Sequence, residues 1–174
     1  MSQLFVCSLA DMPDFTSQLR PDRVITLLQP EWQPPTPVEI EPRHHHRVEI
    51  NDITEPEPDQ ILPNRGHVEE LVAFLEDARE ASLLIHCWAG ISRSTAAALI
   101  AMVLDAPGRE REAVATLRAR APWAEPNRLI IRLADEVLGR KGGLVHAHAA
   151  MEPAIAPPES RGLLELPRSL GRPD

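Results

Sequence analysis

Short apolar runs alternate along the chain with longer segments of helical character. The runs are rich in β-branched residues and stop at turn-forming residues, which is the pattern of strands buried on both faces of a sheet. They predict strands over residues 4–7, 23–28, 47–50 and 82–86. The longer segments, either amphipathic at helical spacing or apolar throughout, predict helices over residues 11–19, 68–75, 94–104, 109–119 and 127–139.

Strands that alternate with helices indicate an α/β fold, with a central, mainly parallel sheet flanked by helices. Residues 30–43 contain several prolines and predict an ordered loop or an extended crossover. Beyond Met151 the chain is again rich in proline and has no periodicity. We therefore expect a catalytic domain over residues 1–150 and a poorly ordered tail over residues 151–174.

The composition fits a single globular domain of 174 residues, with 43% hydrophobic and 25% charged residues. A net charge of −8 argues against broad attraction to nucleic acid or to an anionic membrane. The first residues include no basic region, and no apolar run is long enough to cross a bilayer, so a cytoplasmic location is the default expectation. Cys7 and Cys87 are too few for a disulfide framework, and both are expected to be reduced.

The segment from Ile85 to Thr95 holds the most informative chemistry, because a buried strand runs into a tight loop and the loop into a helix. Backbone N–H groups of such a loop converge on one point, and the helix N-terminus adds positive partial charge. Gly90 permits a tight turn. Arg93, six positions after Cys87, can bind two oxygens of an oxyanion. The same field favours the nucleophilic thiolate of Cys87.

The order His86-Cys87-x5-Arg93-Ser94 resembles the signature loop of the protein tyrosine phosphatase superfamily. The resemblance implies that Cys87 is the nucleophile and Arg93 the phosphate-binding arginine. It also implies that the Ser94 hydroxyl assists release of the thiolate and that His86 orients the loop. The amides that would bind phosphate belong to Trp88, Ala89, Gly90, Ile91, Ser92 and Arg93.

Members of this superfamily carry a general-acid aspartate upstream of the cysteine, on a loop that follows a strand. Asp52 has this placement here, directly after a predicted strand. Glu55, Glu57 and Asp59 follow in the same loop and are the alternative acids. The position at the end of the strand favours Asp52.

The resemblance covers roughly residues 20–140 and points to the compact, dual-specificity-like members of bacterial type, since the chain is short and has no tyrosine. It implies a phosphomonoester hydrolase with a phospho-cysteine intermediate, no cofactor and no metal. The substrate would be a phosphorylated protein or a small phosphomonoester, and its identity and the oligomeric state stay open. A loop without lysine over residues 88–92 disfavours a lipid or inositol phosphatase.

Two other functions compete with a phosphatase. A rhodanese-type sulfur transferase also uses a loop cysteine, but it would need neither Asp52 nor the Arg93-Ser94 ending. A binding module that reads phosphate without turnover is disfavoured because Cys87, Arg93 and Asp52 are all present.

Several further residues have a structural interpretation beside a functional one. Residues 44–46 are three histidines, expected at a solvated loop edge rather than in a metal site. Cys7 is expected in the core, with a role as resolving partner of oxidised Cys87 as the alternative. Trp32 and Trp88 either pack or line the substrate pocket. Arg128 is either an exposed residue at a helix start or a second phosphate contact.

Overall fold

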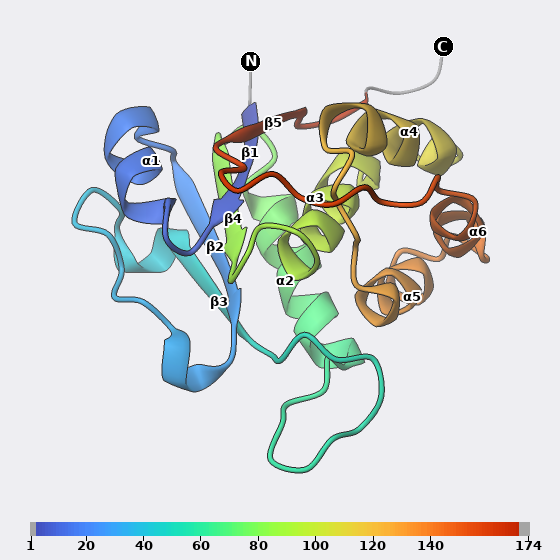
Figure 1. The fold of residues 1–174 in the computed structure, drawn as a ribbon, viewed down its shortest axis with the longest axis horizontal. Coiled ribbons are helices and arrows are strands. Elements are labelled where there is room, and N and C mark those ends of the chain that lie inside the picture. Colours follow the sequence, from blue (N-terminus) through green and yellow to red (C-terminus); the bar gives the residue numbers. More distant parts are fainter. Residues whose placement is uncertain (1–2, 171–174) are drawn as a thin grey trace.

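The computed structural model describes residues 3–170 and contains one five-stranded sheet with helices on both faces (Figure 1). The strand order is β3-β2-β4-β1-β5, and β1 to β4 are parallel while β5 runs antiparallel to β1. The α/β fold with a mainly parallel sheet is thereby confirmed. The strands are β1 (Gln3–Ser8), β2 (Arg23–Leu28), β3 (His45–Glu49), β4 (Leu83–Cys87) and β5 (Leu164–Pro167).

Each predicted helix is present, and two short 3-10 helices interrupt the proline-rich crossover between β2 and β3. One helix, α6, was not predicted, because it is short and begins beside two glycines, Gly142 and Gly143. The helical elements are α1 (Met12–Leu19), η1 (Pro30–Trp32), η2 (Pro42–His44), α2 (Arg65–Asp77), α3 (Arg93–Val103), α4 (Glu110–Arg120), α5 (Arg128–Val137) and α6 (Gly143–Ala149).

Alternate residues of the strands face two separate apolar layers. Leu4 and Val6 of β1 pack into the larger layer with α2 to α6, while Phe5 and Cys7 point to the smaller layer under α1. Every residue of α3 is buried, which explains why its sequence is apolar throughout after the polar first turn. Because β4 lies between β2 and β1, the loop after β4 emerges at the centre of the carboxyl edge of the sheet, where open α/β folds bind ligands.

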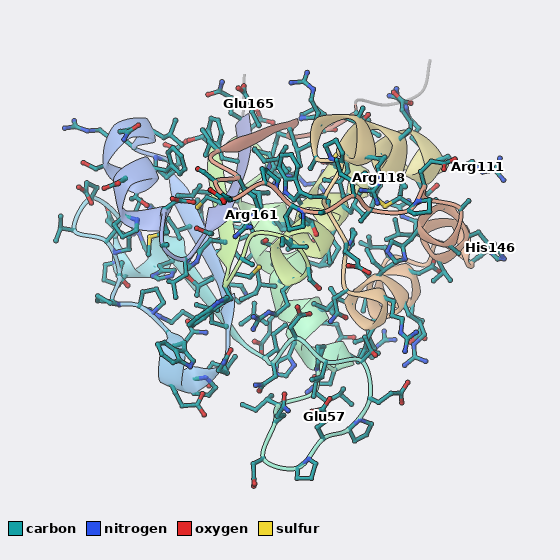
Figure 2. The ribbon with its side chains drawn as sticks, viewed as in Figure 1. Glu57, Arg111, Arg118, His146, Arg161 and Glu165 are labelled. Carbon is teal, nitrogen blue, oxygen red and sulfur yellow. The ribbon has the colours of Figure 1, made fainter. Side chains whose placement is uncertain are left out.

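The C-terminal segment differs from the poorly ordered tail expected over residues 151–174. Residues 164–167 form β5 on the open edge of β1, where Leu164 and Leu166 are buried and Glu165 between them is exposed (Figure 2). The expectation is therefore wrong for this part of the segment. The alternation of apolar and polar residues in β5 is too short to stand out in the sequence among the prolines. The strand is stabilised because it pairs with backbone groups on the edge of β1 that would otherwise have no partner.

Arg168, directly after β5, fixes the same segment to the helices behind the sheet. Its guanidinium is buried, with 4% of the residue exposed. It donates hydrogen bonds to the carbonyl oxygens of Ala101 in α3, Leu75 in α2 and Ala78 after α2. Helix ends leave such carbonyls without partners inside the helix, so Arg168 satisfies groups that burial would otherwise leave unpaired.

Candidate active site

The residues that follow β4 form a signature loop, defined here as residues 87–93. Gly90 within it has a φ of +71°, a conformation that residues with a Cβ rarely adopt. A Cβ at this position would also lie 2.9 Å from the carbonyl carbon and oxygen of Cys7. The loop thus packs directly on the backbone of β1, and both its turn and this close approach require glycine.

Carbonyl groups of the signature loop point outward to partners in neighbouring segments. Because a trans peptide unit directs its N–H opposite to its C=O, the N–H groups of the following residues point back toward the centre of the loop. This arrangement produces the cradle of donors that an oxyanion needs. The outward bonds run from backbone N–H groups to carbonyls: Leu9 to Trp88 at 3.1 Å, Glu125 to Ile91 at 3.0 Å and Asn127 to Ser92 at 3.3 Å.

Cys87 ends β4 with its side chain beside the first turn of α3. Its Sγ lies 3.1 Å from the Oγ of Ser94, and both residues are buried. The helix N-terminus contributes positive partial charge at this point. A hydroxyl at this distance can donate a hydrogen bond to a thiolate, which is the contact that the sequence predicts for Ser94.

Arg93 is buried, with 5% of the residue exposed, yet only one part of its guanidinium is engaged. Its Nη1 donates to the carbonyl oxygen of Ile50 at 2.9 Å and to the Oε1 of Gln29 at 3.3 Å. Its buried Nε has no hydrogen-bond partner within the described residues. A buried donor without a partner is costly. The free edge of the guanidinium is therefore suited to binding an oxyanion.

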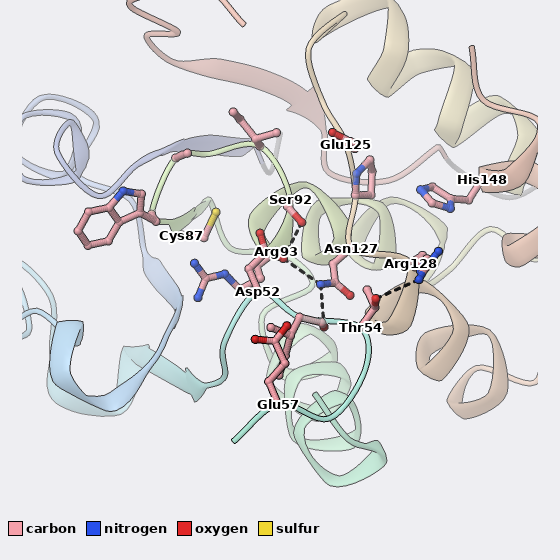
Figure 3. Close-up of a pocket in the computed structure, with 15 residues that line it drawn as sticks. Asp52, Thr54, Glu57, Cys87, Ser92, Arg93, Glu125, Asn127, Arg128 and His148 are labelled. Atoms are coloured by element: carbon pink, nitrogen blue, oxygen red, sulfur yellow. Dashed lines mark hydrogen bonds between the residues drawn. The ribbon is translucent and has the colours of Figure 1, made fainter. Parts of the chain in front are cut away.

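Asp52 lies across from Cys87, on the loop that follows β3 (Figure 3). Its Oδ1 accepts hydrogen bonds from the Oγ of Ser92 at 2.8 Å and from the Nδ2 of Asn127 at 2.9 Å. No hydrogen bond to its Oδ2 occurs within residues 3–170. Two donors at Oδ1 leave Oδ2 as the oxygen on which a proton can reside.

Asn127 is a site residue that the sequence did not reveal. Its Nδ2 bonds Asp52, while its Oδ1 accepts from the backbone N–H groups of Leu129 and Ile130 and so caps α5. The sequence shows the capping asparagine at a helix start. It contains no signal for the contact with Asp52, because the two residues are 75 positions apart.

A cavity of about 740 Å³ extends from Cys87 and Arg93 to the start of α5 (Figure 3). Of the four candidate acids, Asp52 and Glu57 line it, whereas Glu55 and Asp59 do not. Arg128 also faces the cavity, and its Nη2 donates to the Oγ1 of Thr54 at 3.2 Å. The cavity leaves room beyond the signature loop for a group that carries a phosphate.

No protein-family model matches the chain, but a curated protein and several solved structures are similar to it. Dual specificity protein phosphatase 15 of Rattus norvegicus is 34% identical over 84 residues, which is 47% of this chain and 33% of that protein. The match thus spans about a third of the length of this curated relative.

Solved structures of the same group share the fold. The structure of DUSP15 has a TM-score of 0.59 at 20% identity, covering 87% of this chain and 94% of that one. The Yvh1 phosphatase domain of Chaetomium thermophilum has a TM-score of 0.59 at 21% identity, covering 81% and 93%. Human DUSP28 has a TM-score of 0.55 at 19% identity, covering 78% and 91%. The chain therefore has the fold of dual-specificity phosphatases and is similar in sequence to one of them over about half of its length.

His86 lies in β4 directly before the signature loop and is fully buried. The Oγ1 of Thr26 lies 2.7 Å from the Nε2 of His86 and 2.7 Å from the Nε2 of His45. Burial, together with the neighbouring His45, lowers the pKa of His86 to about 3. Burial, followed by Arg47 and His46, lowers the pKa of His45 to about 4. Both imidazoles are therefore neutral near neutral pH.

The histidine run at residues 44–46 corrects one expectation. A solvated loop edge was predicted, but His45 begins β3 and is only 7% exposed. Through the hydroxyl of Thr26 it is linked to buried His86. His46 is half-buried and stacks on Phe74 with ring centroids 5.0 Å apart. Polar residues in a strand are hard to place from sequence when their partners are other buried polar groups. Among the described residues, no histidine, cysteine or acidic side chains are grouped so as to hold a metal ion.

Cys7 and the two tryptophans complete the candidates. Cys7 is in the core, as predicted, and burial first of all raises the pKa of its thiol, with Asp11 and Cys87 adding to the shift. A thiol of raised pKa is a poor partner for oxidised Cys87. Trp88 lines the cavity and packs edge-to-face on Trp32, with centroids 4.8 Å apart and about half of each residue exposed.

None of the helices over residues 3–170 is long and apolar enough to span a membrane.

Proposed function

We propose that this protein hydrolyses phosphomonoesters through a phospho-Cys87 intermediate, with Asp52 as general acid. The observation that carries the proposal is the unpartnered Nε of buried Arg93, a residue that lines the same cavity as Cys87 and Asp52. The oxyanion cradle, the nucleophile and the acid thus converge on one cavity. The relatives named above are called phosphatases, and their similarity to this chain supports the same reaction class.

In the first step, the Cys87 thiolate attacks phosphorus, so an S–P bond forms as the P–O bond to the leaving group breaks. Arg93 and the amides of the signature loop hold the three equatorial oxygens, where the transition-state charge is spread. The protonated Oδ2 of Asp52 gives its proton to the departing oxygen. The two hydrogen bonds at Oδ1 hold the carboxyl group in place during this transfer.

In the second step, water attacks the phosphorus of phospho-Cys87 and the S–P bond breaks. Asp52, now ionised, removes a proton from this water and returns to its starting state. Ser94, at 3.1 Å from the sulfur, donates a hydrogen bond that stabilises the departing thiolate. Arg93, the loop amides and the N-terminus of α3 supply the positive charge that both steps require.

The substrate in this proposal is a phosphorylated protein or a small phosphomonoester. The cavity continues from Cys87 past Asp52 to Arg128, so the group bearing the phosphate would lie between the loop after β3 and the start of α5. The cytoplasmic location expected from the sequence stays a prediction.

Hydrolysis of p-nitrophenyl phosphate in the presence of a chelator tests the proposal. We expect turnover by the parent protein, and none by Cys87→Ser, which keeps the fold and still binds tungstate. Mass spectrometry of the parent, quenched in acid during turnover, should show phosphate on Cys87. Appreciable turnover by Cys87→Ser would exclude the phospho-cysteine mechanism, and inactivation of the parent by chelator would indicate a metal-dependent reaction.

A further inference from the structure

The signature loop has one contact that its sequence did not predict, made by an arginine of the C-terminal segment. The Nε of Arg161 donates a 2.7 Å hydrogen bond to the carbonyl oxygen of Ala89. The two residues are 72 positions apart, and Arg161 is half-buried in the stretch that leads into β5. Figure 2 shows Arg161 near the centre of the molecule, away from the helices that form the far end of the cavity.

This contact differs in kind from the others that hold the loop. The carbonyls of Trp88, Ile91 and Ser92 accept from neutral donors: backbone N–H groups and, for Ile91 and Ser92, also the hydroxyl of nearby Thr95. The carbonyl of Ala89 accepts instead from a guanidinium, a charged donor whose hydrogen bonds are about twice as strong as neutral ones.

The position of the contact determines what it can do. Ala89 and Gly90 share one planar trans peptide unit, so the Gly90 N–H points away from Arg161 when the Ala89 carbonyl points toward it. Arg161 is not among the residues that line the cavity, whereas Cys87 and Arg93 of the loop are, so the contact with Ala89 is made from outside the cavity. A peptide unit next to glycine rotates easily, because φ of either sign is accessible. An external hydrogen bond therefore selects one of its orientations.

We propose that Arg161 is a positioning residue for the reaction proposed above: by holding the Ala89 carbonyl, it keeps the Gly90 N–H directed at the bound phosphate. The inference rests on the proposed function. Arg161 itself touches no reacting atom and acts through the Ala89–Gly90 peptide unit. The C-terminal segment is then part of the catalytic machinery as well as an added strand.

The test compares Arg161→Met and Arg161→Lys with the parent protein. Methionine keeps the apolar stem but has no donor, whereas lysine keeps a cationic donor. Tungstate, a stable phosphate analogue, is titrated calorimetrically, and kcat and KM are measured with p-nitrophenyl phosphate. For Arg161→Met we expect a roughly tenfold weaker Kd for tungstate and a similar fall in kcat, as for loss of one charge-assisted hydrogen bond. Arg161→Lys should recover part of both.

Two control variants separate positioning from stability and from charge. Val114→Ala removes buried apolar volume in α4 and should lower the melting temperature without changing a residue of the loop or of the C-terminal segment. Arg120→Ala removes one exposed positive charge from the end of the same helix. Both should bind tungstate like the parent. Parent-like tungstate binding by Arg161→Met, or an equal loss in either control, would overturn the proposal, and so would an Arg161→Lys no better than Arg161→Met.

The titration requires no turnover, so the two proposals can fail separately. A parent protein that binds tungstate but does not hydrolyse aryl phosphates would reject the phosphatase proposal, and the effect of Arg161 on the loop would still be measured. A parent that turns over normally, with Arg161→Met unchanged, would reject the role of Arg161 alone. A parent that neither binds tungstate nor hydrolyses the substrate would overturn both.

Discussion

Asp52 is held by two hydrogen bonds at one carboxylate oxygen, and none to the other oxygen occurs within the described residues. If it is the general acid, Asp52→Asn should slow phenyl phosphate hydrolysis far more than hydrolysis of an aryl phosphate with a strongly acidic phenol. A good leaving group departs as an anion and needs little protonation, whereas a poor one depends on the donor. The variant should also lose the alkaline limb of the profile of rate against pH. Steady-state kinetics with the two substrates measure both effects.

The neighbouring acids serve as controls for this prediction. Glu55→Gln and Asp59→Asn lie outside the cavity and should behave like the parent. Glu57→Gln is the sharper comparison, because Glu57 lines the cavity. If Glu57→Gln shows the leaving-group dependence and Asp52→Asn does not, Glu57 is the acid.

The Nη1 of Arg93 is bound to the carbonyl oxygen of Ile50, and its Nε has no partner within the described residues. If the proposed function is right, the protein and the phosphate bind different parts of this guanidinium. Lysine has one nitrogen and cannot serve both, so Arg93→Lys should lose at least about a hundredfold in kcat/KM although its charge is kept. Arg132→Lys, on the exposed side of α5, is the matched control. Near-normal kinetics of Arg93→Lys would place phosphate away from this side chain.

At the scale of elements, the contribution of β5 to stability can be measured by comparing a buried with an exposed residue of the strand. Leu166 is buried, with 3% of the residue exposed, while Glu165 beside it is exposed. Leu166→Ala should lower the free energy of unfolding by roughly 2–3 kcal/mol. Glu165→Ala should change it by less than about 0.5 kcal/mol. Denaturant titrations of the two variants provide the measurement, and equal effects would mean that β5 does not dock through its leucines.

The whole molecule should lose stability in acid partly through its buried histidines. The pKa of His86 is lowered to about 3 and that of His45 to about 4. In the unfolded chain both histidines have their ordinary pKa of about 6.5. Below that pH the unfolded chain therefore binds more protons on these two residues than the folded protein does. Stability therefore rises with pH over this window and falls as the pH drops from about 6.5 toward 4.

Replacement of one histidine isolates this contribution from that of the carboxylates. His45→Gln removes one of the two buried histidines that contact Thr26. The free energy of unfolding of this variant should depend less steeply on pH between about 4 and 6.5 than that of the parent. Equilibrium unfolding across this range measures the two slopes. Parallel slopes would mean that His45 is charged in the folded protein.

The sequence predicted what depends on neighbours along the chain. The four parallel strands, the main helices and the order from Cys87 to Ser94 follow from local periodicity and from one continuous loop. The relations that escaped it join distant segments, such as Asn127 with Asp52 and Arg161 with Ala89. A strand as short as β5 has too little periodicity to stand out, and its pairing is decided by the open edge of β1.

The antiparallel pairing of β5 has a consequence for how copies of this protein behave toward each other. An open edge on β1 would be a template for pairing with another molecule and so a route to aggregation. β5 covers that edge and is itself a poor template, because it is short, ends at Pro167, which has no N–H, and carries exposed Glu165. A chain that terminates before Leu164 should therefore be more prone to aggregate during expression than the chain of 174 residues.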